Sequence, residues 1–383
     1  MSATPCHSGN ASLGILSTYP PTQCGLATFS AALWTELDGG LGRVGVVRVV
    51  DRPETHAGRE VVGHLVNGCS DSALEAVKLL NDFDAVVVQH EYGIFGGRDG
   101  SDVLPVLDAL TVPLIVVLHT VLEDPTPGQR HVLTKLLEFA DVVVTMTETA
   151  RLRVLDLYGA DPRAVRVIAH GAVRAAAPTP ARRHGSRPLI LSWGLLGPGK
   201  GIEWAIDALA GLRDLAPRYL VLGRTHPKVL EREGERYRES WLRRAAARGV
   251  LDLIELDDSY LSTPDLAAVV ASADVVVLPY DSQEQVTSGV LVEAVAAGRP
   301  VVSTAFPHAV ELLGNGLGLV VPQRDPAALE VALRRVLCDP ELAKGLAHAA
   351  AIKAPDLLWE SVAAEYRRLA HGLIAKRLAA ASC

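Results

Sequence analysis

Short runs of Val, Ile and Leu alternate with longer amphipathic segments along most of the chain. Such runs are typical of buried parallel strands, and the segments between them have the spacing of helices that cover a sheet. The pattern predicts two series of strands on either side of a stretch rich in Ala, Pro and Arg at residues 172–188. The first series is SLGILST, VGVVRVV, DAVVVQH, PLIVVLH, DVVVTMT and AVRVIAH; the second is PLILSWG, RYLVLGRT, LDLIELD, DVVVLPY and PVVSTAF.

This alternation predicts an α/β fold of two doubly wound, Rossmann-like parallel-sheet domains facing across a cleft. We expect an N-terminal, acceptor-side domain over residues 1–180 and a donor-binding domain over residues 181–357. A C-terminal helix over residues 358–383 is expected to cross back to the first domain. Ligands of such sheets bind at the carboxyl ends of the strands, so functional residues are expected there.

Composition narrows the class of protein. The chain has 383 residues, 49% hydrophobic but only 5% aromatic, and a net charge of −7 that disfavours a general nucleic-acid binder. No apolar stretch reaches transmembrane length, and the N-terminus lacks a signal-peptide pattern, so a cytoplasmic location is expected. The basic C-terminal helix could lie on an anionic membrane, but packing across the domains is favoured. The cysteines are odd in number, scattered and without a CxxC pair, which indicates a reducing compartment and no structural zinc: Cys6, Cys24, Cys69, Cys338 and Cys383.

The stretch LILSWGLLGPGKGIEWAIDAL joins a predicted strand to a predicted helix through a loop with four glycines. Glycines allow a ligand to approach the backbone, and Lys200 adds a full positive charge, so the loop favours a phosphate ligand. Gly194 to Lys200 match the P-loop spacing, but Gly201 stands where a P-loop needs Ser or Thr for magnesium. The competing interpretation is a flexible turn with a solvated lysine.

A second candidate anion site lies in SQEQVTSGVLVEA, residues 282–294. If Thr287 or Ser288 caps the helix, the amides of residues 288–290 are free to bind an anion, and Gly289 lets the ligand come close. Val290 belongs to this amide-lined first turn.

Glu293 lies four residues beyond Gly289 on the same helical face, within an apolar run. A carboxylate there can accept hydrogen bonds from two adjacent ribose hydroxyls. An ion pair with a neighbour such as Arg299 is equally compatible with the sequence.

In the first half, VVVQHEYGIFGGRDG places His90, Glu91 and Tyr92 at a strand end before a Gly-Gly pair. Polar and aromatic side chains on such a loop suit an acceptor sugar, although an ordinary solvated loop has the same composition.

The stretches GLLGPGKGIEWAI, ADVVVLPYDSQEQVTSGVLVEAVAAGRPVVST, CGLATFSAAL and IVVLHT together resemble the retaining glycosyltransferases of family 4, which have the GT-B architecture. The resemblance covers most of the chain. It implies sugar transfer from a nucleotide diphosphate sugar, GDP-mannose slightly favoured over UDP-sugars, to a hydroxyl of a sugar or small-molecule acceptor. It implies no metal ion and no cofactor.

The resemblance assigns roles to the second half of the chain. Family members bind the donor with a Glu-x7-Glu motif whose second glutamate, here Glu293, holds the ribose. Gln285 occupies the first position, where it can hydrogen bond the sugar but carries no charge. Lys200 matches the lysine that binds the diphosphate, whereas Leu195 stands at the position of its partner arginine. Arg224, at the end of the next strand, is a candidate replacement or else a surface arginine.

In the first half, the resemblance places His119 against the donor sugar, although a strand-end histidine is otherwise more often structural. Gly25 corresponds to a glycine whose loop approaches the donor phosphates and acceptor, or else serves a tight turn. Glu311 resembles a glutamate near the donor, with His308 beside it. The catalytic candidates are thus His119, Lys200 and Gln285; the donor-binding candidates are Gly25, Gly194, Lys200, Arg224, Gln285, Thr287, Ser288, Gly289, Val290 and Glu293.

Three other functions compete with this one. A GT-B phosphorylase would use a sugar phosphate, which a ribose ligand at Glu293 disfavours. A non-catalytic nucleotide-sugar binder is favoured by the neutral Gln285 and Leu195. A P-loop phosphotransferase would hydrolyse triphosphates with magnesium, which the missing Ser or Thr disfavours.

Overall fold

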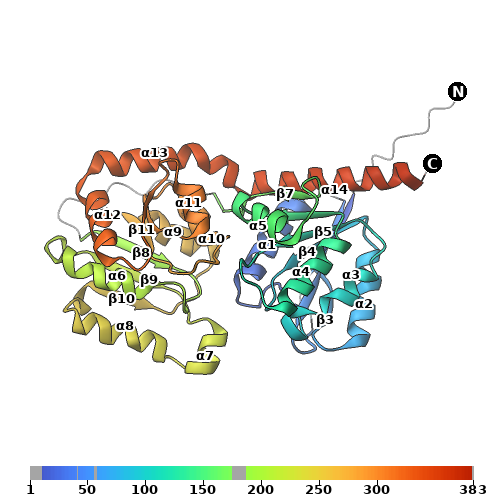
Figure 1. Ribbon diagram of the computed structural model, residues 1–383, viewed down its shortest axis with the longest axis horizontal. Helices are drawn as coiled ribbons and strands as arrows, with labels where there is room; N and C mark the ends of the chain where they lie inside the picture. The colour runs from blue at the N-terminus through green and yellow to red at the C-terminus, as the bar shows by residue number, and fades with distance from the viewer. Residues whose placement is uncertain (1–10, 41, 56–57, 175–186, 382–383) are drawn as a thin grey trace. The chain divides into compact units, whose positions relative to one another are not determined.

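The computed structural model describes residues 11–381 except 41, 56–57 and 175–186. The chain forms two compact units (Figure 1): unit 1 comprises Met1–Ala169 with Trp359–Cys383, and unit 2 comprises His170–Leu358. The expected domain boundary at 180/181, most of the Ala/Pro/Arg-rich stretch, the extreme N-terminal segment, Cys6 and Cys383 lie outside the described residues.

Unit 1 is built on a seven-stranded sheet with the order β3-β2-β1-β4-β5-β6-β7, in which every neighbouring pair is parallel. The order reverses between β1 and β4, so the loops that follow these two strands flank the switch point. The strands are β1 (Ser12–Ser17), β2 (Arg43–Val50), β3 (Val61–Val66), β4 (Ala85–His90), β5 (Leu114–Leu118), β6 (Val142–Thr145) and β7 (Val165–Val167); the α-helices are α1 (Gly25–Asp38), α2 (Ser70–Asn81), α3 (Val103–Asp108), α4 (Pro127–Phe139), α5 (Glu148–Tyr158) and α14 (Trp359–Ala381).

Unit 2 repeats the plan with a six-stranded parallel sheet of order β10-β9-β8-β11-β12-β13. Its switch point lies between β8 and β11, the two strands that precede the Gly-rich loop and the QEQVTSG loop. The strands are β8 (Leu189–Trp193), β9 (Arg218–Leu222), β10 (Ile254–Asp257), β11 (Val275–Leu278), β12 (Val301–Thr304) and β13 (Leu319–Val321); the α-helices are α6 (Ile202–Leu209), α7 (Pro227–Glu233), α8 (Arg236–Ala247), α9 (Thr263–Ser272), α10 (Gly289–Ala296), α11 (Pro307–Leu313), α12 (Pro326–Cys338) and α13 (Pro340–Leu357).

The predicted fold class, two doubly wound parallel-sheet units, is confirmed. Central strands are buried on both faces: the adjacent residues Val116 and Val117 in unit 1, and Val276 and Val277 in unit 2, have no exposed surface. Their continuous apolar sequences follow from this burial. Two strands were not predicted, β3 and β13. Both lie at sheet edges and are partly exposed. The apolar run of β3 is interrupted by Gly63 and His64, and β13 is only three residues long.

The C-terminal segment is two helices, because the chain leaves helical geometry at Leu358, between α13 and α14. Within unit 1, α14 packs on α1: the Trp359 ring meets Phe29 edge-on at 4.8 Å between centroids, and Arg367 donates to the Glu36 carbonyl at 2.8 Å. Tyr366 is fully buried in the same core. The apolar face that a membrane could have covered is therefore occupied by unit 1. Among the described residues, no helix is long and apolar enough to cross a bilayer.

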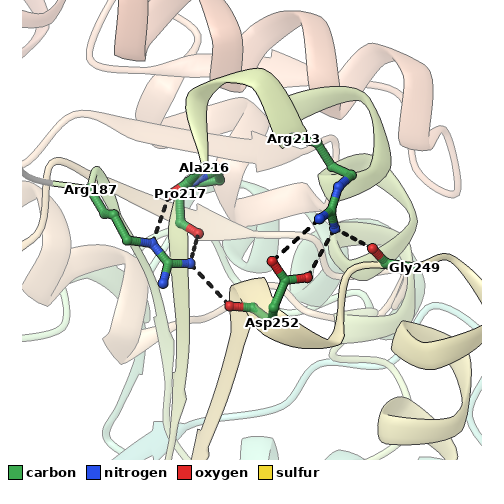
Figure 2. Close-up of polar contacts among 6 residues, drawn as sticks. All are labelled: Arg187, Arg213, Ala216, Pro217, Gly249 and Asp252. Carbon is green, nitrogen blue, oxygen red and sulfur yellow. Dashed lines mark hydrogen bonds and ion pairs between the residues drawn. The ribbon is translucent and has the colours of Figure 1, made fainter.

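A cluster of hydrogen bonds and ion pairs links the loops at the amino edge of the unit 2 sheet (Figure 2). Arg187 donates to the carbonyl oxygens of Ala216 and Pro217, both at 2.9 Å, and of Asp252, at 3.1 Å. Arg213 binds the Asp252 carboxylate, at 3.0 Å for the shorter contact. These bonds join the loops at the start of β8, β9 and β10. The carboxyl edge of the sheet, which carries the candidate site, is held by a different set of contacts.

Candidate functional site

The Gly-rich loop and the loop after β11 lie against each other at the carboxyl edge of the unit 2 sheet. Gly201 has φ 61°, and a Cβ added to it would lie 2.0 Å from the Pro279 carbonyl oxygen, so only glycine fits there. The Asp281 amide donates to the Gly199 carbonyl at 3.1 Å. The glycines of this loop thus serve first to bring the two loops together.

Lys200 is positioned by this contact. Its Nζ lies 4.1 Å from the centroid of the Tyr280 ring, which in turn stacks on Phe306 at 4.9 Å. Tyr280 is 2% exposed, and its hydroxyl has no hydrogen-bond partner among the described residues. The buried ring is therefore a platform that holds the ammonium by cation–π attraction. The interpretation of Lys200 as a freely solvated lysine does not fit this contact.

The first turn of α10 presents backbone amides beside the same loops. Ser288 caps the helix, since its Oγ accepts from the Leu291 amide at 3.3 Å. The Ser288 amide, expected to be free for an anion, instead donates to His308 Nδ1 at 2.8 Å. The amides of Gly289 and Val290 remain, because the first turn of a helix offers them no intrahelical acceptor.

Two further features mark this helix start. The Thr287 hydroxyl is buried and has no hydrogen-bond partner among the described residues, so it is available to a ligand. Gly194, whose φ is 118°, lies beside the same turn: a Cβ added to it would be 3.4 Å from Val290 Cγ2. Leu195 follows directly, so the position of the family arginine is adjacent to α10.

Glu293 is held by Trp193, the last residue of β8. The indole Nε1 donates to Glu293 Oε2 at 3.1 Å, and burial raises the pKa of the carboxyl while this hydrogen bond opposes the rise. Arg299, the alternative partner, donates instead to the carbonyl oxygens of Ala271 and Ala273, at 3.0 and 3.3 Å. As a whole residue, Glu293 is partly exposed.

Gln285 is tied into its own loop. Its side-chain Nε2 donates to the Thr287 carbonyl, and its backbone carbonyl accepts from the His308 amide at 3.3 Å. The amide side chain therefore shapes the turn that leads into α10, a contact that a glutamate could not make because it has no N–H to donate.

His308 and His170 lie near the start of α10. Burial lowers the pKa of His308 to about 4, with Glu311 acting against this shift and His170 adding to it. His170 Nδ1 lies 2.7 Å from the Gly171 carbonyl, and a Cβ added to Gly289 would be 2.7 Å from His170 Nε2. The sequence did not single out His170, because a lone histidine 119 positions before Gly289 carries no local pattern.

Arg224 lies exposed at the end of β9, where its Nε donates to the Asp258 carbonyl at 3.3 Å. Its backbone carbonyl accepts from the Leu196 amide at 2.8 Å, so Arg224 neighbours the Gly-rich loop along the backbone.

In unit 1, His119 follows β5 and its Nε2 lies 2.7 Å from Gln89 Oε1. Its ring meets Phe29 edge-on at 4.9 Å. Gln89 is fully buried, so its contact with Nε2 fixes the orientation of the His119 imidazole. His119 itself keeps part of its surface exposed.

The acceptor candidates after β4 divide into buried and accessible groups. His90 was expected to reach a ligand, but it is fully buried beside Tyr92 and Phe95, and neither ring nitrogen has a hydrogen-bond partner among the described residues. Burial lowers its pKa to about 3. Glu91 accepts from the Thr120 hydroxyl, and Tyr92 donates to the Gln129 carbonyl at 3.4 Å; both remain partly exposed.

Gly25 begins α1, directly after the cap residue Cys24. Its φ is not positive, and a Cβ added to it would meet nothing within 4 Å. Neither backbone geometry nor packing requires glycine here, which argues against the tight-turn interpretation; the close approach of a ligand stays a prediction.

The fold has counterparts among solved proteins. Anabaena Alr3699/HepE in complex with UDP and glucose superposes with a TM-score of 0.75, covering 95% of this chain and 100% of that one at 16% identity. A glycosyltransferase from Rickettsia africae gives a TM-score of 0.74, covering 95% and 99% at 16% identity. The chain has the GT-B fold.

Sequence comparison extends this result within the GT-B chain. Residues 187–339 match the family described as glycosyl transferases group 1. A glycogen synthase of Mycobacterium tuberculosis is 32% identical over 232 residues, which are 60% of this chain and 53% of that protein, so the chain spans about half the length of this relative. A D-inositol 3-phosphate glycosyltransferase of Kineococcus radiotolerans is 28% identical over 320 residues, 70% of this chain and 69% of that one. Together these comparisons support a glycosyltransferase of the GT-B type.

Within the described part of this GT-B chain, no three His, Cys, Asp or Glu side chains are grouped so that they could hold a metal ion. Lys200 and Glu293 are two charged groups of opposite sign at the candidate site.

Proposed function

We propose that this protein is a retaining glycosyltransferase that moves a sugar from a nucleotide diphosphate sugar to an acceptor hydroxyl, without a metal ion or cofactor. One observation carries the proposal: α10 begins with the open amides of Gly289 and Val290 and presents Glu293 one turn later, beside the loop that holds Lys200. Amides and an ammonium suit a diphosphate, and a carboxylate suits ribose hydroxyls.

The chemistry requires stabilisation of the departing diphosphate. Lys200 and the first-turn amides of α10 would neutralise the charge that develops on the leaving oxygen, in positions fixed before the reaction. Gln285, and His119 of unit 1, would orient the sugar. The bond between the anomeric carbon and the phosphate oxygen breaks, the acceptor oxygen bonds to the same face, and the leaving phosphate oxygen takes the acceptor proton. No protein nucleophile is needed in this scheme.

The donor and acceptor are proposed as classes. The resemblance in sequence slightly favours GDP-mannose, whereas the Anabaena neighbour is described in complex with UDP and glucose. On the acceptor side, Glu91 and Tyr92 offer polar atoms that suit a sugar or another polyhydroxylated small molecule.

A second candidate is a binder of nucleotide sugars that does not turn them over. Gln285 and Leu195 favour it, because both are neutral where the family has a charged residue. The two functions predict the same donor affinity and differ in turnover.

The proposal is tested first by thermal shift with GDP, UDP, ADP and their sugars, since a ligand that binds only the folded state raises the melting temperature. A K200A variant should lose most of the shift, whereas Lys344→Ala, on the exposed surface of α13, should keep it. No shift with any nucleotide would refute the proposal. The nucleotide sugar that shifts is then incubated with sugar acceptors, and the anomeric configuration of the product is read by NMR; binding without transfer establishes the second candidate.

A further inference from the structure

His170 lies against the start of α10 in a fixed tautomeric state. Its Nδ1 is 2.7 Å from the Gly171 carbonyl oxygen, which can only accept, so Nδ1 carries the proton. In a neutral ring, Nε2 then carries the lone pair. This Nε2 is the ring atom nearest to Gly289, since a Cβ added to that glycine would lie 2.7 Å from it. His170 therefore turns a proton-accepting atom toward the first turn of α10.

A diphosphate ligand at the same turn needs more positive charge than Lys200 alone provides. A nucleotide diphosphate sugar brings two negative charges, and the diphosphate gains another as the sugar leaves. Lys200 supplies one full positive charge. At the position after Gly194, beside Val290, the chain has the neutral Leu195. A second cation at this place would complete the electrostatic balance.

An independent feature shows that the start of α10 is prepared for a polar ligand. The Thr287 hydroxyl precedes the cap residue, is 8% exposed, and has no hydrogen-bond partner among the described residues. A buried hydroxyl without a partner is costly unless a ligand supplies one. The hydroxyl and the amides of Gly289 and Val290 thus lie at one helix start, with His170 alongside.

We propose that His170 takes up a proton from solvent when the donor diphosphate binds at the start of α10, and that the resulting imidazolium supplies the second positive charge. The inference rests on the proposed function. Nδ1–H keeps its bond to Gly171, and the new Nε2–H donates to a phosphate oxygen. Donor binding is then coupled to the uptake of one proton, and the charge appears only when the anion is present.

The surroundings of His170 agree with this coupling. Burial lowers its pKa to about 4, against the effect of the Gly171 hydrogen bond, so the ring is neutral at pH 7 before the ligand arrives. An adjacent anion raises the pKa of a histidine. The titratable and charged groups near His170 include His308 and Glu311 of α11 and Glu293 of α10.

Isothermal titration calorimetry measures this proton directly. Intact UDP-glucose and GDP-mannose are the probes, because their diphosphates have no group that titrates near neutral pH. Titrations at about pH 7 in two buffers of different ionisation enthalpy give the number of protons taken up, which we expect to be positive and at most one. The affinity of the bound probe should fall as pH rises, by up to about tenfold per pH unit.

Variants assign the proton to His170. H170N should bind the probe more weakly, take up no proton and lose the pH dependence. Adding Leu195→Arg to H170N should restore affinity without proton uptake, because a guanidinium is always charged. The control His348→Asn, on the exposed surface of α13, should behave as the unchanged protein.

The possible outcomes distinguish the proposed function from the inference about His170. If neither probe nor any nucleotide binds, the proposed function fails. If a probe binds without proton uptake, or if uptake persists in H170N and disappears in His226→Asn or His308→Asn, the inference about His170 is overturned while the proposed function stands. If H170N folds poorly, the number of protons that the unchanged protein takes up on binding the probe still tests the inference, because an uptake of zero overturns it.

Discussion

The indole of Trp193 and the carboxylate of Glu293 are joined by a hydrogen bond of 3.1 Å, from Nε1 to Oε2. It connects the last residue of β8 to the middle of α10, 100 positions later in the sequence. One carboxylate oxygen is thereby fixed by the protein. A glutamate in an apolar helix is thus explained without an ion pair: the indole orients it, and the ribose is proposed to complete its hydrogen bonding.

Glu293→Gln is expected to weaken donor binding and to stabilise the free protein. Losing hydrogen bonds to a charged acceptor costs about 1.5–3 kcal/mol, or roughly 10- to 100-fold in affinity. Burial raises the pKa of Glu293 in the folded protein above its value in the unfolded chain. The folded protein is therefore most stable below the unfolded pKa, and it loses stability as pH rises through the folded pKa. The side chain of Gln does not ionise, so the Glu293→Gln variant avoids this loss of stability at neutral pH. Calorimetric titration and thermal melts measure both effects, with Glu341→Gln on α13 as the control; lower melting with unchanged affinity would contradict the assignment.

Tyr280→Phe and Tyr280→Leu form a matched pair that tests how Lys200 is positioned. The hydroxyl has no hydrogen-bond partner among the described residues, so Phe should preserve both stability and donor affinity. Leu removes the ring beneath the ammonium, which should weaken binding by about 2- to 30-fold if the cation–π contact contributes about 0.5–2 kcal/mol. In a K200A background the Leu substitution should add little. Equal donor affinities of the Phe and Leu variants would show that the Tyr280 ring does not position Lys200.

Gln285→Glu is expected to slow transfer by roughly tenfold, the effect of one lost hydrogen bond of about 1–1.5 kcal/mol. The side-chain amide donates to the Thr287 carbonyl, and a carboxylate at that place meets a carbonyl oxygen instead. Gln285→Ala should be at least as slow, because it also lacks the atom proposed to contact the sugar. The measurement is kcat with the donor saturating. A Glu variant as fast as the unchanged protein would show that the loop does not depend on this bond.

Gly289→Ala is expected to lower donor affinity, because the new methyl group would lie 2.7 Å from His170 Nε2 and the imidazole would have to move. Gly25→Ala is the contrasting variant: its methyl group meets nothing within 4 Å, so its melting temperature should not change. Any loss of activity in Gly25→Ala would then report the approach of a ligand. Donor affinity and melting temperature are measured for both; unchanged affinity in Gly289→Ala would separate His170 from the donor site.

Unit 2 is expected to lose stability on acidification through His308. Burial lowers the pKa of His308 to about 4, below its unfolded value, so stability present above the unfolded pKa is lost as pH falls toward about 4. Protonation of Nδ1 would also break the bond from the Ser288 amide. His308→Asn keeps an acceptor near that position but does not titrate, so its melting temperature should fall less between about pH 6.5 and 4. A parallel decline in the variant and the unchanged protein would assign the acid sensitivity elsewhere.

The sequence predicted the fold and the two loops of the site because their signals are local. A run of Val, Ile or Leu followed at once by glycines or by QEQVTSG identifies a strand and the loop after it. The pairs that shape the site are not local. Trp193 and Glu293 meet because β8 and β11 are neighbours in the sheet, and His170 and Gly289 are 119 positions apart. No pattern in either segment alone announces its partner.

His90 shows a different limit of the strand pattern. A polar residue at a strand end was expected to face a ligand, but the loop that follows folds back over it. Asn67 holds that loop, accepting from the Gly96 amide at 2.8 Å and donating to the Ile94 carbonyl at 3.1 Å. Burial of His90 therefore depends on a residue of another strand's loop, which periodicity along β4 cannot reveal.

The pairing of α14 with α1 makes unit 2 an insertion within unit 1. During synthesis, α14 leaves the ribosome only after all of unit 2 has emerged. The core around Phe29 therefore stays incomplete until Trp359 and Tyr366 are available to pack into it. The unit whose strands are made first is thus completed last, whereas unit 2 has all its strands in one continuous stretch. A nascent chain arrested before α14 would carry a complete unit 2 joined to an incomplete unit 1 whose apolar face is still open.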